Sequence, residues 1–220
     1  MSTWHAWERD FLLSVVRLVA GTYPVWHHGA PSASQTIYFS NHTSHIDTLA
    51  ILAALPSELR HQVRPVAARD YWQRGKAKVH IARDLLNVVL IDRKHEGEGD
   101  PLDPVREALR LGESVIIFPE GTRSAEALPQ AFKSGIFRLA SEFPDIDLCP
   151  VYLENLQRIM PKGAIWPVPL ICKVHFGGTL QLKPEEAKAD FLRRARDAIV
   201  ELSPAREALE TAARTATSDQ

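Results

Sequence analysis

Two side chains in the first quarter of the chain have the types needed for acid–base chemistry. His42 and Asp47 lie five residues apart in the segment NHTSHID, directly after the apolar residues Ile37–Phe39. A histidine that removes a proton near neutral pH works best when a carboxylate holds its other ring nitrogen. On a helix, residues five apart are rotated by about 140°, so this pair meets only if the chain turns between them. We expect that turn at Thr43–Ser44, between a strand and a helix.

Other interpretations of the same segment stay open. Asn, Ser, Thr and Asp residues often cap helices or bind loop backbone, and this cluster alone is typical of that role. Ser44 between two histidines could be a nucleophile, but a hydrolase elbow has the pattern G-x-S-x-G and this chain has H-T-S-H-I. His42, His45 and Asp47 could bind a metal, yet the H-E-x-x-H pattern is absent, so we expect no metal.

Two more polar clusters follow apolar segments. Asp92-Arg93 comes after Val88–Ile91, and Glu120–Arg123 comes after Val115–Phe118. If these strands are parallel, both clusters join His42 at the carboxyl edge of one sheet, where open α/β sheets bind ligands. Three such clusters are better explained by a site than by chance.

The arginines in these clusters, Arg93 and Arg123, predict a bound anion, because a guanidinium grips phosphate through a planar fork of donors. Lys133 adds positive charge, and Gly121 lets the backbone turn sharply or approach a ligand closely. Either arginine alone is more typical of an exposed ion pair. Together with His42 they predict a site that binds a phosphate-bearing alcohol and removes its hydroxyl proton.

Apolar strands alternate with amphipathic helices, and this order predicts an α/β fold with a central, mostly parallel sheet flanked by helices. We predict strands at Ile37–Phe39, Pro65–Ala68, Val88–Ile91, Val115–Phe118, Leu148–Leu153 and Ile171–Phe176. We predict helices at Asp47–Ala54, Asp70–Leu86, Pro104–Leu111, Pro129–Glu142 and Glu185–Ser203.

Length and composition set limits on the class of protein. At 220 residues we expect one full-sized domain at residues 23–210, preceded by an amphipathic helix at 1–22 and followed by a flexible tail at 211–220. The formal net charge of −1 argues against a nucleic-acid-binding protein, which usually carries a basic excess. Cys149 and Cys172 lie in apolar runs outside any C-x-x-C pattern, so we expect buried free thiols in a reducing compartment.

The N-terminal segment has an apolar stripe at helical spacing. The stripe consists of Trp4, Trp7, Phe11, Val15, Leu18 and Val19. Such a stripe usually packs on the core, but tryptophans at one end of a terminal amphipathic helix also suit a membrane interface, and both interpretations stay open. The apolar stretch Phe11–Ala20 is interrupted by Ser14 and Arg17 and falls short of the roughly 20 residues that cross a bilayer. We therefore expect neither a transmembrane span nor a secretory signal.

Four segments of the chain resemble the sequence blocks of the glycerolipid acyltransferases. NHTSHID, LIDR, FPEGTRS and CPVYLEN occur in the order of those blocks and span Asn41 to about Asn155. The resemblance is strongest to the 1-acylglycerol-3-phosphate (lysophosphatidate) acyltransferases of the compact bacterial type. The second block departs from the family pattern, because Asn87 and Leu90 stand where G-x-I-F-I-D-R has Gly and Phe.

The resemblance implies roles for individual residues. It implies that His42 is the catalytic base and Asp47 its partner. It places the acceptor phosphate at the second and third blocks and links the fourth block to the acyl donor. The substrate-binding residues that we expect are Asn41, Ser44, Asp92, Arg93, Glu120, Gly121, Thr122, Arg123, Lys133 and Pro150.

The resemblance also implies a reaction. A fatty acyl group would pass from an acyl thioester, acyl-CoA or acyl carrier protein, to the hydroxyl of a lysophospholipid, with 1-acylglycerol-3-phosphate the expected acceptor and no cofactor required. Because the lysolipid and the acyl group both carry long apolar chains, we expect a cytoplasmic protein peripherally associated with the inner face of the cell membrane. Two alternatives stay open: the same chemistry on another lysolipid or alcohol, and a membrane lipid-binding protein without catalysis.

Overall fold

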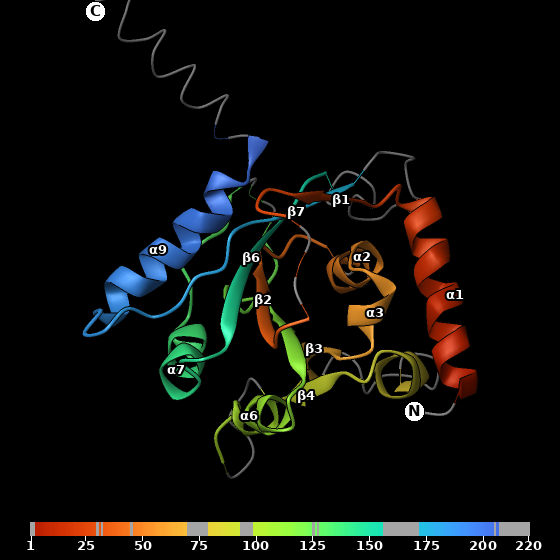
Figure 1. Cartoon of the computed structure of the whole chain (residues 1–220), viewed down its shortest axis with the longest axis horizontal. Helices are drawn as coiled ribbons and strands as arrows, with labels where there is room; N and C mark the ends of the chain where they lie inside the picture. Colours follow the sequence, from red (N-terminus) through yellow and green to blue (C-terminus); the bar gives the residue numbers. More distant parts are fainter. Residues whose placement is uncertain are drawn as a thin grey trace, which may run out of the picture.

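The structure, a computed structural model, describes residues 3–29, 31, 33–44, 46–69, 79–92, 99–124, 126, 128–155, 172–204 and 206, with side chains from residue 7 onward. Within these residues the chain forms a central seven-stranded sheet with helices on both faces (Figure 1). The predicted tail at 211–220 lies outside the described residues. The predicted domain limits at 1–22 and 23–210 stay predictions.

The sheet has the strand order β1-β7-β6-β2-β5-β3-β4. Its strands are β1 (Tyr23–Trp26), β2 (Thr36–Ser40), β3 (Val63–Ala68), β4 (Val89–Ile91), β5 (Ser114–Ile117), β6 (Asp147–Leu153) and β7 (Lys173–Phe176). Neighbours from β6 to β4 in this order are parallel, as predicted. β7 is antiparallel to β6, and β1, which was not predicted, pairs parallel with β7. The prediction of a mostly parallel sheet is therefore confirmed.

The central strands are buried on both faces, which explains their continuous apolar sequences. Ile37 and Phe39 of β2 point into one helix layer, and Tyr38 between them points into the other. Cys149 and Cys172 are buried free thiols, as predicted, and burial raises the pKa of each to about 12.

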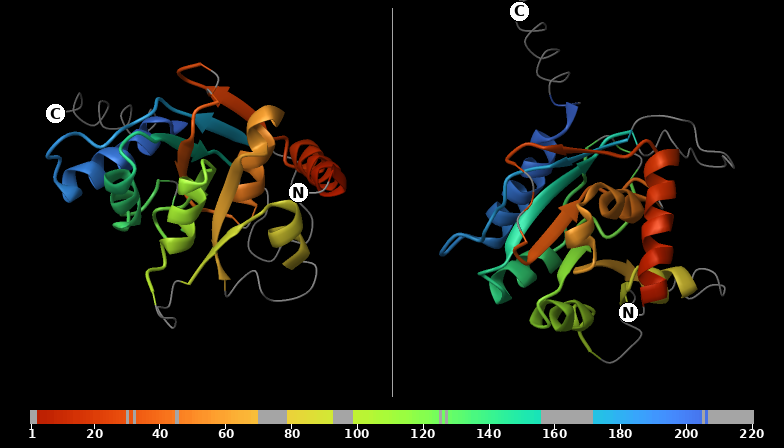
Figure 2. Two further views of the ribbon diagram at one scale, coloured as in Figure 1. Left: turned by 60° about the horizontal axis from the view of Figure 1, so that its bottom comes forward. Right: turned by 45° about the vertical axis from the view of Figure 1, so that its right-hand side comes forward.

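Each face of the sheet has its own helix layer (Figures 1 and 2). One layer contains α1 (Thr3–Val19), α2 (Asp47–Ala54), α3 (Ser57–Arg60) and the π-helical turn η1 (Ile81–Leu85). The other contains α6 (Asp103–Arg110), α7 (Gly135–Glu142) and α9 (Lys188–Glu201). In the first layer α1 lies outermost, and α2 lies between it and the sheet.

Two helices begin later than predicted, because the residues before them have non-helical hydrogen bonds or a non-helical backbone. α2 has the predicted bounds, but α7 begins at Gly135 rather than Pro129, because the N–H groups of Gln130 and Lys133 bond to the Glu120 carboxylate and the Pro119 carbonyl. The predicted helix Glu185–Ser203 begins later, at Lys188, because Glu185 has a left-handed backbone (φ +58°). Of the predicted helix Asp70–Leu86, residues 70–78 lie outside the described residues.

Helix α1 presents two apolar faces. Its inner face packs on the core through Leu12, Leu13 and Val16, and Ala20, directly after the helix, is buried in the same core. The predicted stripe lies on the opposite side, because Trp7 is 63% exposed, Phe11 61% and Leu18 83%. The interpretation of this stripe as a core face is therefore wrong from Trp7 onward. In the described part of the chain, no helix is long and apolar enough to span a membrane.

An arginine that is 7% exposed joins the layer of α6 and α7. Arg106 donates hydrogen bonds to Glu142 (2.8 Å), Asp103 (2.7 Å) and Asp100 (3.0 Å). Arg138 and Arg106 hold the pKa of Asp100 well below its usual range. These ion pairs join α6 and the loop before it to α7.

Candidate active site

The carboxylate of Asp47 organises the turn between β2 and α2. It has no solvent exposure, and its Oδ2 accepts hydrogen bonds from His42 Nδ1 (2.8 Å), the Thr43 N–H (2.7 Å) and the Ser44 N–H (2.9 Å). Asp47 is also the first residue of α2, where the helix dipole favours a negative charge. The turn predicted at Thr43–Ser44 is thus formed, and it brings His42 and Asp47 together.

The Asp47 contact also sets the protonation pattern of His42. An ionised carboxylate can only accept, so Nδ1 of the ring carries the proton and Nε2 carries the lone pair. The side chain of His42 is 22% exposed, enough for a substrate hydroxyl to reach the ring. The pair therefore has the geometry of a general base held by its orienting group.

The loop after β5 holds the backbone of His42 from the other side. Glu120 accepts the His42 N–H at 2.9 Å and the Gln130 N–H at 3.0 Å, and the Ser124 N–H donates to the His42 carbonyl at 2.8 Å. Glu120 is 5% exposed. In the structure this carboxylate ties two loops together, and the substrate contact that we predicted for it stays a prediction.

Two other predicted substrate-binding residues are buried, Asn41 directly after β2 and Pro150 within β6. The Asn41 amide is 2% exposed, and its Oδ1 accepts the Leu153 N–H at 2.9 Å, joining β2 to β6. Pro150 is buried in β6 opposite Phe39, and its ring lies against Gly177. In this structure both side chains serve the packing of the sheet, and their predicted substrate contacts stay predictions.

The cations predicted near the third block lie beside the loop after β5. The backbone of Gly121 is left-handed (φ +71°), and the Lys133 Nζ would lie 2.6 Å from a Cβ at this position. The Lys133 ammonium therefore covers the glycine, whose left-handed backbone forms the sharp turn that we expected, while a close approach to a ligand stays a prediction. Lys133, Thr122 and Arg123 are all exposed.

The second block lies farther from His42. Asp92 directly follows β4, at the same edge of the sheet as His42, but β3 and β5 separate the two strands. Three strand spacings place β4 roughly 14 Å from β2. Arg93 and His45 lie outside the described residues, so their predicted roles stay predictions.

Two other interpretations of the NHTSHID segment were a nucleophilic serine and a metal site. Ser44 is 7% exposed, and its Oγ accepts a hydrogen bond from the Ile46 N–H at 3.4 Å, which is a local turn contact. Among the described residues, His, Cys, Asp and Glu side chains form no group of three or more that could hold a metal ion.

Sequence reasoning missed three contacts of the site. The ring of Phe118 stacks on the His42 imidazole, the Ser124 N–H binds the His42 carbonyl, and the Gln130 N–H binds Glu120. Phe118 belongs to the FPEGTRS segment that was singled out, so a signal for it existed. The other two are backbone contacts, which carry no residue-type signal.

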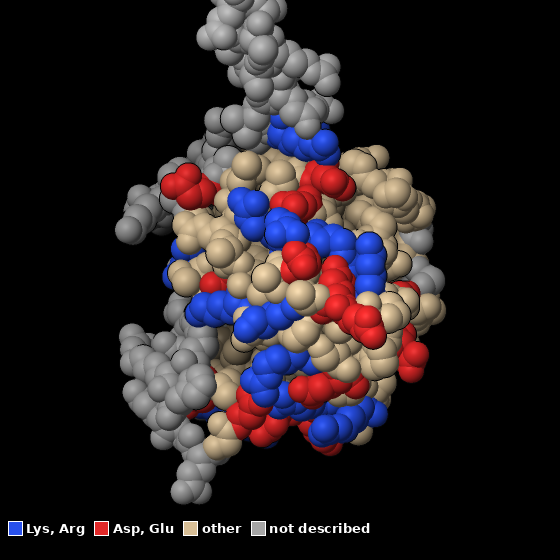
Figure 3. Space-filling model, turned by 90° about the vertical axis from the view of Figure 1, so that its left-hand side faces the viewer, with Lys and Arg blue, Asp and Glu red and all other residues tan. Residues whose placement is uncertain are grey.

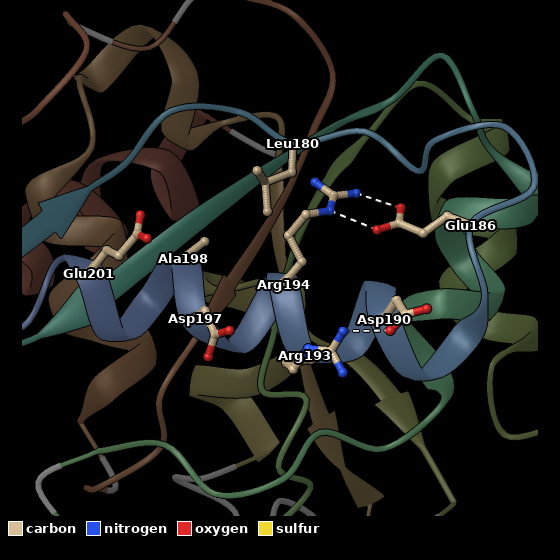
Figure 4. Close-up of a pocket in the computed structure, with 8 residues that line it drawn as sticks. All are labelled: Leu180, Glu186, Asp190, Arg193, Arg194, Asp197, Ala198 and Glu201. Atoms are coloured by element: carbon tan, nitrogen blue, oxygen red, sulfur yellow. Dashed lines mark hydrogen bonds and ion pairs between the residues drawn. The ribbon is translucent and has the colours of Figure 1, made fainter.

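The side of the molecule that carries α9 exposes many charged side chains. Basic and acidic side chains intermingle over it (Figure 3). Beside α9, a groove is lined by charged residues that pair with one another, Arg194 with Glu186 (2.6 Å) and Arg193 with Asp190 (2.5 Å) (Figure 4). The groove lies on the face of the sheet away from α2 and Asp47.

The chain is similar to known acyltransferases in sequence and in fold. The family model described as Acyltransferase matches residues 26–154. The chain is 33% identical over 133 residues to 1-acyl-sn-glycerol-3-phosphate acyltransferase alpha of Ovis aries and 32% identical to that of Homo sapiens, which covers 60% of this chain and 44% of each relative. It thus spans less than half the length of these curated relatives. The crystal structure of the 1-acyl-sn-glycerophosphate (LPA) acyltransferase PlsC from Thermotoga maritima matches with a TM-score of 0.70 and 19% identity, over 90% of this chain and 78% of that one.

The contacts of Glu120 predict a stability effect that can be measured. Glu120→Ala leaves the His42 and Gln130 N–H groups without their acceptor, and we expect the free energy of unfolding in urea to fall by about 2–4 kcal/mol. Glu120→Gln keeps one carbonyl oxygen as an acceptor, so its free energy of unfolding should fall by less than that of Glu120→Ala. Glu107→Ala, on the exposed side of α6, is the control and should change the free energy of unfolding by less than about 0.5 kcal/mol. A Glu120→Ala protein as stable as the parent would contradict the assigned role.

Proposed function

Because the chain belongs to the acyltransferase family, we propose that it moves a fatty acyl group from an acyl thioester to the free hydroxyl of a lysophospholipid. The proposed acceptor is 1-acylglycerol-3-phosphate, which would become phosphatidate. The observation that carries the proposal is the 2.8 Å hydrogen bond between His42 Nδ1 and the buried Asp47 carboxylate at the edge of the sheet. The names of the sheep and human relatives support the choice of acceptor.

The geometry of the His42–Asp47 pair supports direct transfer of the acyl group from the thioester to the acceptor hydroxyl. His42 Nε2 takes the proton of the acceptor hydroxyl while Asp47 stabilises the imidazolium through Nδ1. The resulting alkoxide oxygen attacks the thioester carbonyl and forms a tetrahedral intermediate. Its C–S bond then breaks, and the imidazolium returns the proton to the leaving thiolate. No acyl-enzyme is needed, and both acyl-CoA and acyl carrier protein supply the required thioester.

Positive charge near the base supports a phosphate on the acceptor. Lys133 covers Gly121 on the same loop that holds His42 through Glu120, and Arg123 follows two residues after Gly121. We propose that these cations, with Arg93 from the second block, bind the acceptor phosphate while its hydroxyl reaches His42.

The exposed face of α1 supports a membrane partner. An amphipathic helix with exposed aromatic and aliphatic residues can lie in the headgroup region of a bilayer. Strand β1 starts at Tyr23, which is 60% exposed and pairs with Lys173 of β7. Because β7 is antiparallel to β6, the start of β1 and the end of α1 lie at the sheet edge where β6 and β2 end. Docking through α1, which we propose at the cytoplasmic face of the membrane, would bring that edge to a lipid acceptor.

Replacement of the base tests catalysis. We expect His42→Ala to lower acyl transfer by about 10²–10⁴-fold, the scale of lost general-base catalysis. Ser44→Ala should keep most activity, because the Ser44 hydroxyl contacts the Ile46 backbone. Release of free thiol from acyl-CoA on addition of lysophosphatidate measures both. An acyl group found on Ser44 by mass spectrometry would contradict direct transfer, and lipid binding without any thiol release would favour the non-catalytic alternative.

Membrane docking is tested at the outer face of α1. Deletion of the helix would also remove Leu13 from the core, so point variants are preferable. Phe11→Ser combined with Leu18→Ser should weaken vesicle co-sedimentation roughly tenfold or more, since each side chain gives up about 1.5–3 kcal/mol of apolar burial. Leu111→Ser, an equally exposed position at the end of α6, is the control and should bind as the parent does. Unchanged binding by the double variant would remove α1 from the interface.

Acceptor kinetics test the phosphate contact. Arg123→Ala, Lys133→Ala and Arg93→Ala should each raise the KM for lysophosphatidate more than that for the acyl donor and lower kcat/KM by roughly 10- to 150-fold. Arg123→Lys should keep only part of the parental kcat/KM, because an ammonium cannot bind phosphate through two parallel N–H donors as a guanidinium does. Arg110→Ala on α6 serves as a surface control. Unchanged lysophosphatidate kinetics together with transfer to an uncharged alcohol would replace the proposed acceptor with another.

A further inference from the structure

The ring of Phe118 lies flat on the imidazole of His42. The two ring centroids are 4.2 Å apart and the planes differ by 20°. We propose that Phe118 is a positioning residue for His42, whose aromatic face fixes the plane of the imidazole and stabilises the imidazolium formed during proton transfer. This inference rests on the proposed function, since it concerns the same base.

The stack supplies a restraint that the other contacts of His42 leave out. Glu120 and Ser124 hold the backbone of His42, and Asp47 holds Nδ1. A single hydrogen bond at Nδ1 restrains one atom of the ring, so small changes of χ1 and χ2 can still tilt the imidazole while the bond is kept. A flat aromatic ring against one face opposes that tilt and so restrains the direction in which Nε2 points.

Phe118 is itself held in place. It is half-buried and packs against the core on the side of α1 and α2. Its carbonyl accepts the Gly121 N–H at 2.9 Å, which closes the turn that follows β5. The predicted strand Val115–Phe118 ends one residue earlier, at Ile117, and this leaves the Phe118 ring at the edge of the sheet, over His42.

The stack also acts on charge. When Nε2 takes the proton of the hydroxyl, the imidazole becomes a cation directly over the negative face of the Phe118 ring. Asp47 stabilises this cation in the plane of the ring and Phe118 from above it. Because the positive charge appears on the way to the transition state, the contribution should raise kcat rather than lower KM.

A purely structural role for Phe118 makes a different prediction. If the ring served packing alone, a leucine of similar apolar character would reduce stability and leave turnover unchanged. Tyrosine retains the aromatic face, so Phe118→Tyr separates the two roles. Phe137→Leu is the matched control, because Phe137 is also half-buried in an aromatic contact, with Phe191 on the other face of the sheet.

The test combines steady-state kinetics with NMR of the intact chain. We expect Phe118→Leu to lower kcat for transfer to lysophosphatidate by about 3- to 30-fold, the range of a cation–π contact, with KM changed less than twofold. Phe118→Tyr and Phe137→Leu should keep the parental kcat. Phe118→Met takes the place of the leucine variant if that variant is unfolded.

The NMR arm needs no substrate. The ring protons of His42, assigned by their loss in His42→Ala, should resonate upfield in the parent and return downfield in Phe118→Leu. Parental kcat in Phe118→Leu, or His42 protons without an upfield shift in the parent, would overturn the inference. A parent that shows the upfield shift but acylates no lysophosphatidate would instead overturn the proposed function, and the positioning role would fall with it.

Discussion

A buried carboxylate with three donors on one oxygen is the constraint on which the site depends. Asp47 has no solvent exposure, and an ionised group in that position is stable only if hydrogen bonds replace its water. The donors available are two backbone N–H groups of the Thr43–Ser44 turn and the ring of His42. Satisfying the charge therefore shapes the turn from β2 into α2. The same hydrogen bonds orient His42, so the contacts that stabilise the buried charge also position the base.

The second support of the site comes from a neighbouring strand. β2 and β5 are adjacent and parallel, so the loops that follow them meet at one edge of the sheet. Glu120 and Ser124 bind the two backbone groups of His42, and Phe118 covers its ring. Each restraint comes from a residue more than 70 positions away in the chain, so the base is held by tertiary contacts as well as by its own turn.

The two faces of the molecule differ in what they expose. The α1 side presents an apolar stripe that includes Trp7, Phe11 and Leu18, whereas the α9 side presents charges that pair with one another. Apolar side chains at this level of exposure favour burial against a nonpolar partner, and paired surface charges favour water. The lipid acceptor that we propose would then meet the protein from the α1 side, where the end of that helix reaches the edge that carries His42.

The sequence by itself determined the features that rest on local chemistry. The His42–Asp47 pair lies within one turn of chain, α2 has the predicted bounds, and parallel strands bring their end clusters to one edge. Tertiary structure alone decided which face of α1 meets the core, because helical spacing shows which residues share a face but not what that face contacts. Tertiary structure also decided that side-chain oxygens of Asn41 and Glu120 accept hydrogen bonds from backbone N–H groups, and that Phe118 stacks on His42. Those contacts depend on strand order and register, which no residue type in the chain specifies.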